Sequence, residues 1–107
     1  MNFLEETIKK VFSVDSPSGF YANIDNKLEE ILSSLGYETK RSNKGNVIVE
    51  ISGHDNSKTV ATSAHVDTLG LMVRSINNDG TLSLTKVGGP STPTLDGEYV
   101  TIMTRSG

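Results

Sequence analysis

The sequence predicts an α/β protein in which two helices are followed by strands of two different kinds. Three observations lead to this prediction. Apolar residues recur at helical spacing up to about residue 35, the period changes to two from Tyr37, and hairpin turns dominate the chain after residue 69. We therefore place a boundary near residues 67–70, between an α/β part and a β-rich part.

Two helices open the chain. Residues 2–13 are expected to form the first, with Asn2 as its N-cap and Glu5 three residues later, as in a capping box. A proline and a glycine predict a loop over residues 15–19. The second helix is expected over about residues 20–35, and its apolar stripe is assigned to the core without a functional role.

Strands follow the helices. We expect them at residues 37–42, 47–52, 59–64, 70–77, 81–87 and 98–104. The turn at 77–80 is a hairpin signal, with Gly80 available for a positive φ. The first three strands suit a sheet covered by helices. His65 would then follow a buried strand, at the carboxyl end where open α/β sheets place their active sites.

The composition limits the classes of protein to which this chain can belong. A chain of 107 residues is one domain or a piece of something larger, and it can bury about 60–70% of its unfolded surface. The net charge of −3 argues against a nucleic-acid partner, because phosphate binding needs a concentrated basic patch. The sequence has a single basic cluster, which consists of Lys40, Arg41 and Lys44. We interpret it as solvated charge on both sides of a turn.

The absence of cysteine limits the chemistry. It excludes a disulfide framework and thiolate ligands, so a zinc site here must use imidazole and carboxylate groups. No apolar run reaches the roughly 18 residues that a membrane span needs. The first ten residues begin with acidic side chains and lack a long apolar region, so they do not resemble a secretory signal. We therefore expect a cytoplasmic protein with no membrane partner.

The segment around residues 61–67 contains the candidate chemistry. His65 and Asp67 are two residues apart, and on spacing alone a structural histidine and a turn-capping aspartate remain open alternatives. The small residues at 61, 63 and 64 would let a ligand approach closely. A metal-ligating histidine usually donates its other ring N–H to a carboxylate. We predict that His65 is a metal ligand and that Asp67 orients its imidazole.

Several motifs then resemble one family. They are "AHVDTLGLMV" at 64–73, a hairpin carrying "DG", "TKVGG" at 85–89, "LDGEYVTI" at 95–102, and an early S-x-S-G loop at 16–19. Together they resemble the N-terminal portion of the glutamyl-aminopeptidase family, also called cellulase-M-like, deblocking or tetrahedral (TET) aminopeptidases. The resemblance covers essentially the whole chain, and the motifs are specific only in combination.

The resemblance implies a dinuclear metallopeptidase that removes N-terminal residues from peptides. Residues 1–68 would be the N-terminal part of a zinc-exopeptidase-like αβα catalytic domain, and residues 69–107 the start of a β-rich inserted domain used for dimerisation or larger homo-oligomers. His65 would bind one of two divalent metals, with zinc first and cobalt or manganese as alternatives. Asp67 would orient it. A metal-activated water would attack the peptide carbonyl.

The chain also departs from the family pattern. Thr68 and Leu69 stand where the family more often has Glu and Ile. The other metal ligands and the catalytic glutamates of the family have no counterpart in these 107 residues. His54 lies in a polar turn and is interpreted as a surface residue. Four further aspartates lie in predicted loops, and their spacing favours none of them as a further ligand. They are Asp15, Asp55, Asp79 and Asp96.

Three hypotheses follow. The chain is a fragment of a metal-dependent aminopeptidase that is inactive by itself, a non-catalytic module that assembles through its strands, or a member of a related zinc exopeptidase or deacylase family. The Val-Gly-Gly and hairpin segments argue against the third. In the second, exposed edges of the strands after Gly70 would favour association with other chains. In a fragment, strands at 70–104 would lack partners, and exposed Val100, Ile102 and Met103 would favour self-association.

Overall fold

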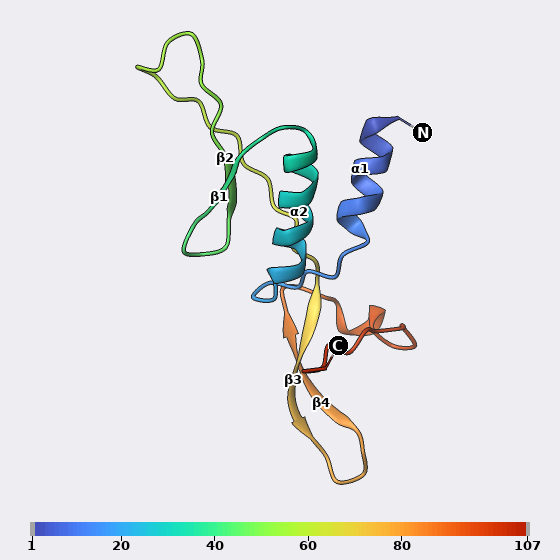
Figure 1. Cartoon of the computed structure of the whole chain (residues 1–107). Coiled ribbons are helices and arrows are strands. Elements are labelled where there is room, and N and C mark those ends of the chain that lie inside the picture. Colours follow the sequence, from blue (N-terminus) through green and yellow to red (C-terminus); the bar gives the residue numbers. More distant parts are fainter. Residues whose placement is uncertain (1, 107) are drawn as a thin grey trace.

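The computed structural model describes residues 2–106 and has a mixed α/β architecture (Figure 1). Two helices and a short hairpin form one half, and a second hairpin with the C-terminal segment forms the other. The elements, in chain order, are α1 (Phe3–Phe12), α2 (Ala22–Ser34), β1 (Thr39–Arg41), β2 (Val47–Val49), β3 (Gly70–Ile76), β4 (Leu82–Val87) and the 3₁₀ helix η1 (Thr92–Thr94).

Helix α1 begins as its sequence predicts. The side-chain oxygen of Asn2 accepts a hydrogen bond from the Glu5 amide at 2.9 Å, and the Glu5 carboxylate accepts one from the Asn2 amide at 3.4 Å. This reciprocal pair satisfies two backbone donors at the start of the helix. Two acidic residues in the first turn and two basic residues in the last complement the helix dipole. The prediction of a capped helix is confirmed.

Helix α2 is also confirmed, but its apolar stripe is only partly covered. Ile24 is the only large aliphatic side chain that is fully buried among residues 2–106, and Leu35 remains 46% exposed. The helix ends as expected at Gly36, whose φ of +85° is the left-handed conformation that glycine adopts without strain. The stripe therefore contacts its neighbours without forming the enclosed core that the sequence predicts.

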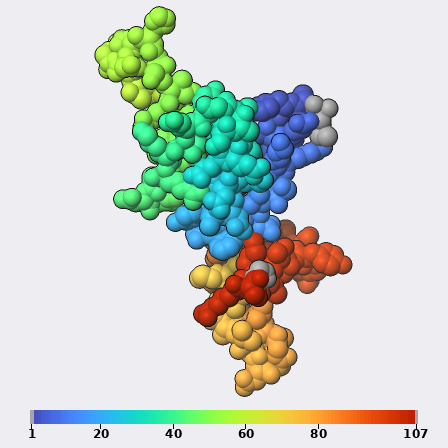
Figure 2. Space-filling view, viewed as in Figure 1, coloured from blue at the N-terminus to red at the C-terminus, as the bar shows by residue number. Residues whose placement is uncertain are grey.

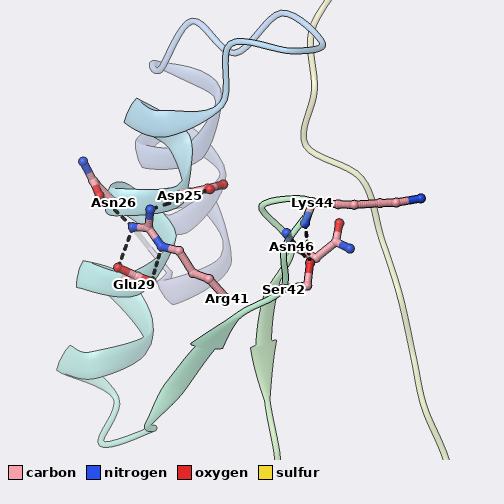
Figure 3. Close-up of polar contacts among 7 residues, drawn as sticks. All are labelled: Asp25, Asn26, Glu29, Arg41, Ser42, Lys44 and Asn46. Atoms are coloured by element: carbon pink, nitrogen blue, oxygen red, sulfur yellow. Dashed lines mark hydrogen bonds and ion pairs between the residues drawn. The ribbon is translucent and has the colours of Figure 1, made fainter.

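The first sheet is the antiparallel pair β1–β2, with Lys40 opposite Ile48. Arg41 ties this hairpin to α2 (Figure 3). Its guanidinium donates to both carboxylate oxygens of Glu29, at 2.6 and 2.7 Å, and to the side chain of Asn26 at 2.7 Å. The interpretation of Arg41 as simply solvated charge is therefore wrong, because its planar fork matches a carboxylate on the neighbouring helix.

The second sheet is the antiparallel pair β3–β4. Its turn at 77–80 has Gly80 at a φ of +84°, as the hairpin prediction requires. The register shifts between Val73 and Ser75, so Arg74 occupies a bulge. This hairpin projects away from the helices in Figure 1. The hairpin prediction for residues 70–87 is confirmed.

Two predicted strands do not form. Residues 59–64 are extended without a sheet partner, and residues 98–104 form no strand after η1. Alternating or apolar sequence favours an extended backbone, but a strand also needs a neighbour whose amide and carbonyl groups complete the ladder. Among residues 2–106, β1 and β2 pair only with each other, and so do β3 and β4. His65 therefore does not follow a sheet strand in this structure.

The molecule is extended, as the space-filling view shows (Figure 2). Its radius of gyration is 17.9 Å, whereas a compact chain of this length would have about 13 Å. The accessible surface is 9171 Å², compared with roughly 5,800 Å² for a compact monomer of this mass. The chain therefore buries less surface than its length allows. None of the described helices is both long and apolar enough to cross a membrane.

Candidate functional site

His65 and Asp67 form a hydrogen-bonded pair. The imidazole Nδ1 lies 2.9 Å from Oδ1 of Asp67. An ionised carboxylate can only accept a hydrogen bond, so Nδ1 carries a proton, and in the neutral imidazole Nε2 then keeps its lone pair. The His65 side chain is 88% exposed, and Nε2 has no protein partner among residues 2–106. The imidazole thus presents one free nitrogen to the outside of the molecule.

Asp67 is itself held by a second group. The hydroxyl of Ser18 donates to Oδ2 of Asp67 at 2.8 Å, while Oδ1 accepts from His65. These two hydrogen bonds, with that from Ser18 the stronger influence, lower the pKa of Asp67 below its usual value. The carboxylate therefore stays ionised through the neutral range, which keeps it an acceptor for the imidazole N–H.

The loop at residues 16–18 docks on the segment that carries the pair. The Ser16 hydroxyl donates to the carbonyl of Val66 at 2.9 Å, and the Thr68 amide donates to the carbonyl of Ser16 at 2.9 Å. Ser16 is only 2% exposed, so its polar groups need these partners. Pro17 and Thr68 also form a parallel bridge. The backbone on both sides of Asp67 is consequently fixed to the loop.

A shallow pocket of about 230 Å³ surrounds the pair. Four segments line it: the loop at 16–18, the beginning of α2, the turn at 44–46 and residues 64–67. Asp25, at the beginning of α2, is 5% exposed and has its carboxylate 3.8 Å from the Arg41 guanidinium. The hydrogen bonds and ion pairs from Arg41 to α2 (Figure 3) therefore also position one wall of this pocket.

The side chains around the pair supply one metal ligand but not a complete metal site. Within residues 2–106, no group of three or more His, Asp or Glu side chains is arranged to hold a metal ion. A free Nε2 opposite an Nδ1–H held by a carboxylate is the usual arrangement of a zinc-binding histidine. His54 is exposed, and the Asp55 and Asp79 carboxylates accept hydrogen bonds within their own turns. The structure brings none of these three to His65.

Comparison with known proteins shows the family of the chain. Residues 45–107, more than half of the chain, match the M42 glutamyl aminopeptidase family. The chain belongs to this family. The matched segment begins in the turn that lines the pocket and includes His65, Asp67 and the β3–β4 hairpin.

Three relatives illustrate the similarity of this M42 chain to other proteins. YhfE of Bacillus subtilis, provisionally named an aminopeptidase, is 40% identical over 102 residues, which are 95% of this chain and 30% of that protein. The glutamyl aminopeptidase of Lactococcus lactis is 30% identical over 97% of this chain and 30% of its own length. The lysyl aminopeptidase of Pyrococcus furiosus is 32% identical over 95% of this chain and 29% of its own length. The chain thus spans about three tenths of these relatives.

The sequence indicates His65 and Asp67 but not the residues that hold them. Ser16 and Ser18 belong to the family's S-x-S-G pattern, which by itself indicates no role for either hydroxyl. In the structure their hydroxyls contact residues 50 and 49 positions later in the chain. Local periodicity carries no information on contacts of that separation, so the family pattern was the only available signal.

Proposed function

We propose that this M42 chain contributes part of a metal-dependent aminopeptidase that removes residues from the N-terminus of peptides. Family membership and the aminopeptidase names of the relatives support this proposal. Residues 1–68 would belong to the catalytic domain and residues 69–107 to a β-rich assembly domain. The observation that carries the proposal is the His65 imidazole, with Nδ1 held by Asp67 and Nε2 free.

The roles of the residues follow from this geometry. Asp67 fixes both the tautomer and the orientation of His65, so that the Nε2 lone pair points away from the protein. The negative charge of Asp67 also makes the imidazole a stronger donor. A divalent metal bound at Nε2, with zinc as the first candidate, would supply a Lewis acid that polarises the peptide carbonyl and activates a water. We assign His65 as a metal ligand and Asp67 as its orienting partner.

The proposal assigns only one ligand to this chain. Catalytic zinc requires three protein ligands and an open position. We therefore propose that the remaining ligands of a two-metal site, together with the general base, lie outside these 107 residues. The isolated chain should bind a divalent metal weakly and hydrolyse no peptide. Peptide substrates, homo-oligomeric assembly and a cytoplasmic location belong to the same proposal.

Calorimetric titration with Zn²⁺ tests the metal ligand, and the chain provides its own matched control. His65 and His54 are its only two histidines, and both are exposed. His65→Ala should abolish the weak binding, whereas His54→Ala should leave it unchanged. Binding that survives His65→Ala and disappears with His54→Ala would contradict the assignment.

An aminoacyl-anilide assay with added Zn²⁺ tests whether the chain acts alone. We expect no release of the anilide by the wild-type chain, because a single imidazole cannot hold a catalytic metal with an open position. Turnover that is lost in His65→Ala would show that the 107 residues contain a complete active site, which would contradict the proposed division of ligands.

A further inference from the structure

We propose that Ser18 is a positioning residue for the metal-binding nitrogen of His65, acting through Asp67. This inference rests on the proposed role of His65 and adds a residue to it. Ser18, Asp67 and His65 form a continuous chain of two hydrogen bonds, 2.8 Å and 2.9 Å long. The three residues come from two segments that are 49 positions apart.

The two bonds use different oxygens of one carboxylate. Ser18 holds Oδ2, and His65 bonds to Oδ1. A carboxylate held at one oxygen cannot rotate freely about its terminal torsion, so its second oxygen remains directed at Nδ1. The Asp67 side chain is 50% exposed, and water would compete for both oxygens without such a constraint. Ser18 thereby favours the Nδ1–H tautomer and leaves Nε2 available as a ligand.

The docking of the loop does not depend on the Ser18 hydroxyl. Ser16 provides its own hydroxyl contact to Val66 and a backbone contact to Thr68. Pro17 adds the bridge to Thr68. The Ser18 hydroxyl has the Asp67 carboxylate as its hydrogen-bond partner. Removal of this hydroxyl should therefore release the carboxylate while the loop stays in place.

The test is the ¹⁵N chemical shifts of the histidine ring nitrogens in the metal-free chain at neutral pH. Wild-type His65 should show a protonated Nδ1 and an unprotonated Nε2, and exposed His54 serves as the internal reference. Ser18→Ala should shift the His65 pattern toward that of His54, with the amide spectrum otherwise preserved. Ser18→Thr, which keeps the hydroxyl, should retain the wild-type pattern. Ser13→Ala removes an exposed hydroxyl that bonds to a carbonyl of its own helix and should change nothing.

Three results would overturn the inference. The first is an unchanged His65 tautomer in Ser18→Ala, and the second is loss of the wild-type tautomer in Ser18→Thr. The third is a collapse of amide dispersion in Ser18→Ala, which would show that the hydroxyl maintains the fold and does not specifically position the Asp67 carboxylate. Zn²⁺ titration of the same samples should show about tenfold weaker binding to Ser18→Ala. If Zn²⁺ fails to perturb His65 in the wild type while the tautomer depends on Ser18, the metal proposal fails and the positioning role stands.

Discussion

At the scale of single residues, the carboxylate of Asp67 is the centre of the site. It accepts from Ser18 on one oxygen and from His65 on the other, and these bonds lower its pKa. The His-x-Asp spacing was enough to predict the pair, because residues i and i+2 reach one side of an extended turn. It was not enough to predict Ser18, because that contact depends on how the loop at 16–18 folds back across 49 residues.

Asp67→Ala should weaken Zn²⁺ binding at His65 by about tenfold or more, because the imidazole loses its orientation and its fixed tautomer. Calorimetry of the variant measures the loss. Asp55→Ala is the matched control, since Asp55 is another exposed loop aspartate whose hydrogen bonds lower its pKa but do not involve His65. Equal weakening by both variants would contradict the assigned role of Asp67.

At the scale of elements, the sequence predicts what depends on nearby residues and fails where a distant partner is required. The capping box of α1, the glycine after α2 and the β3–β4 hairpin are all local, and all are confirmed. The strands expected at 59–64 and 98–104 are absent from the described structure because neither segment meets a sheet edge. An apolar pattern indicates that a segment can become a strand, but only a neighbour makes it one.

Adding one methyl group at Gly70, the first residue of β3, tests the contact between this strand and the loop at 16–18. A Cβ added at Gly70 would lie 2.5 Å from Cβ of Pro17, whereas one added at Gly89 would meet no atom within 4 Å. Gly70→Ala should therefore displace the loop and destabilise the fold by about 1–3 kcal/mol, the usual effect of overpacking. Denaturant unfolding of both variants measures the difference. A Gly70→Ala chain as stable as Gly89→Ala would contradict the observed docking.

The Arg41–Glu29 pair should make the attachment of β1 to α2 depend on pH. The hydrogen bond from Arg41 lowers the pKa of Glu29 in the folded chain. The pair therefore stabilises the fold above the ordinary glutamate pKa and loses this contribution as the pH falls through the lowered folded value. Denaturant unfolding between pH 7 and about pH 3, a range that spans the ordinary glutamate pKa, should show this loss.

Glu29→Gln should flatten part of that pH dependence, because the ionisable partner of Arg41 is gone. Glu98→Gln is the control, since Glu98 forms no ion pair among the described residues. A pH profile of Glu29→Gln identical to that of the wild type would show that the pair contributes nothing measurable, as many exposed ion pairs do.

At the scale of the whole molecule, the chain exposes more apolar surface than a compact monomer would. Exposed apolar side chains occur in both halves, and on the β-rich half Met72 is 59%, Ile76 is 75% and Tyr99 is 102% exposed. An open groove of about 820 Å³ runs between β3, β4 and the segment at 99–103. Contiguous apolar surface of this kind favours contact with other protein surfaces.

The 107-residue chain should therefore self-associate. Light scattering at increasing concentration should give a mass above the 11.5 kDa of one chain. Replacement of Val100 and Ile102, which are 62% and 55% exposed, by serine should reduce the association, because it removes apolar area from the groove. A concentration-independent monomer in the wild type would contradict this prediction.

The central claim is that His65 offers Nε2 to a metal while Asp67 holds Nδ1. The most direct measurement is the ¹⁵N shift of each His65 ring nitrogen during titration of the wild-type chain with Zn²⁺. The account predicts that Nε2 responds to the metal while Nδ1 remains protonated and bonded to Asp67. A response at Nδ1, or at His54 with His65 unchanged, would contradict it.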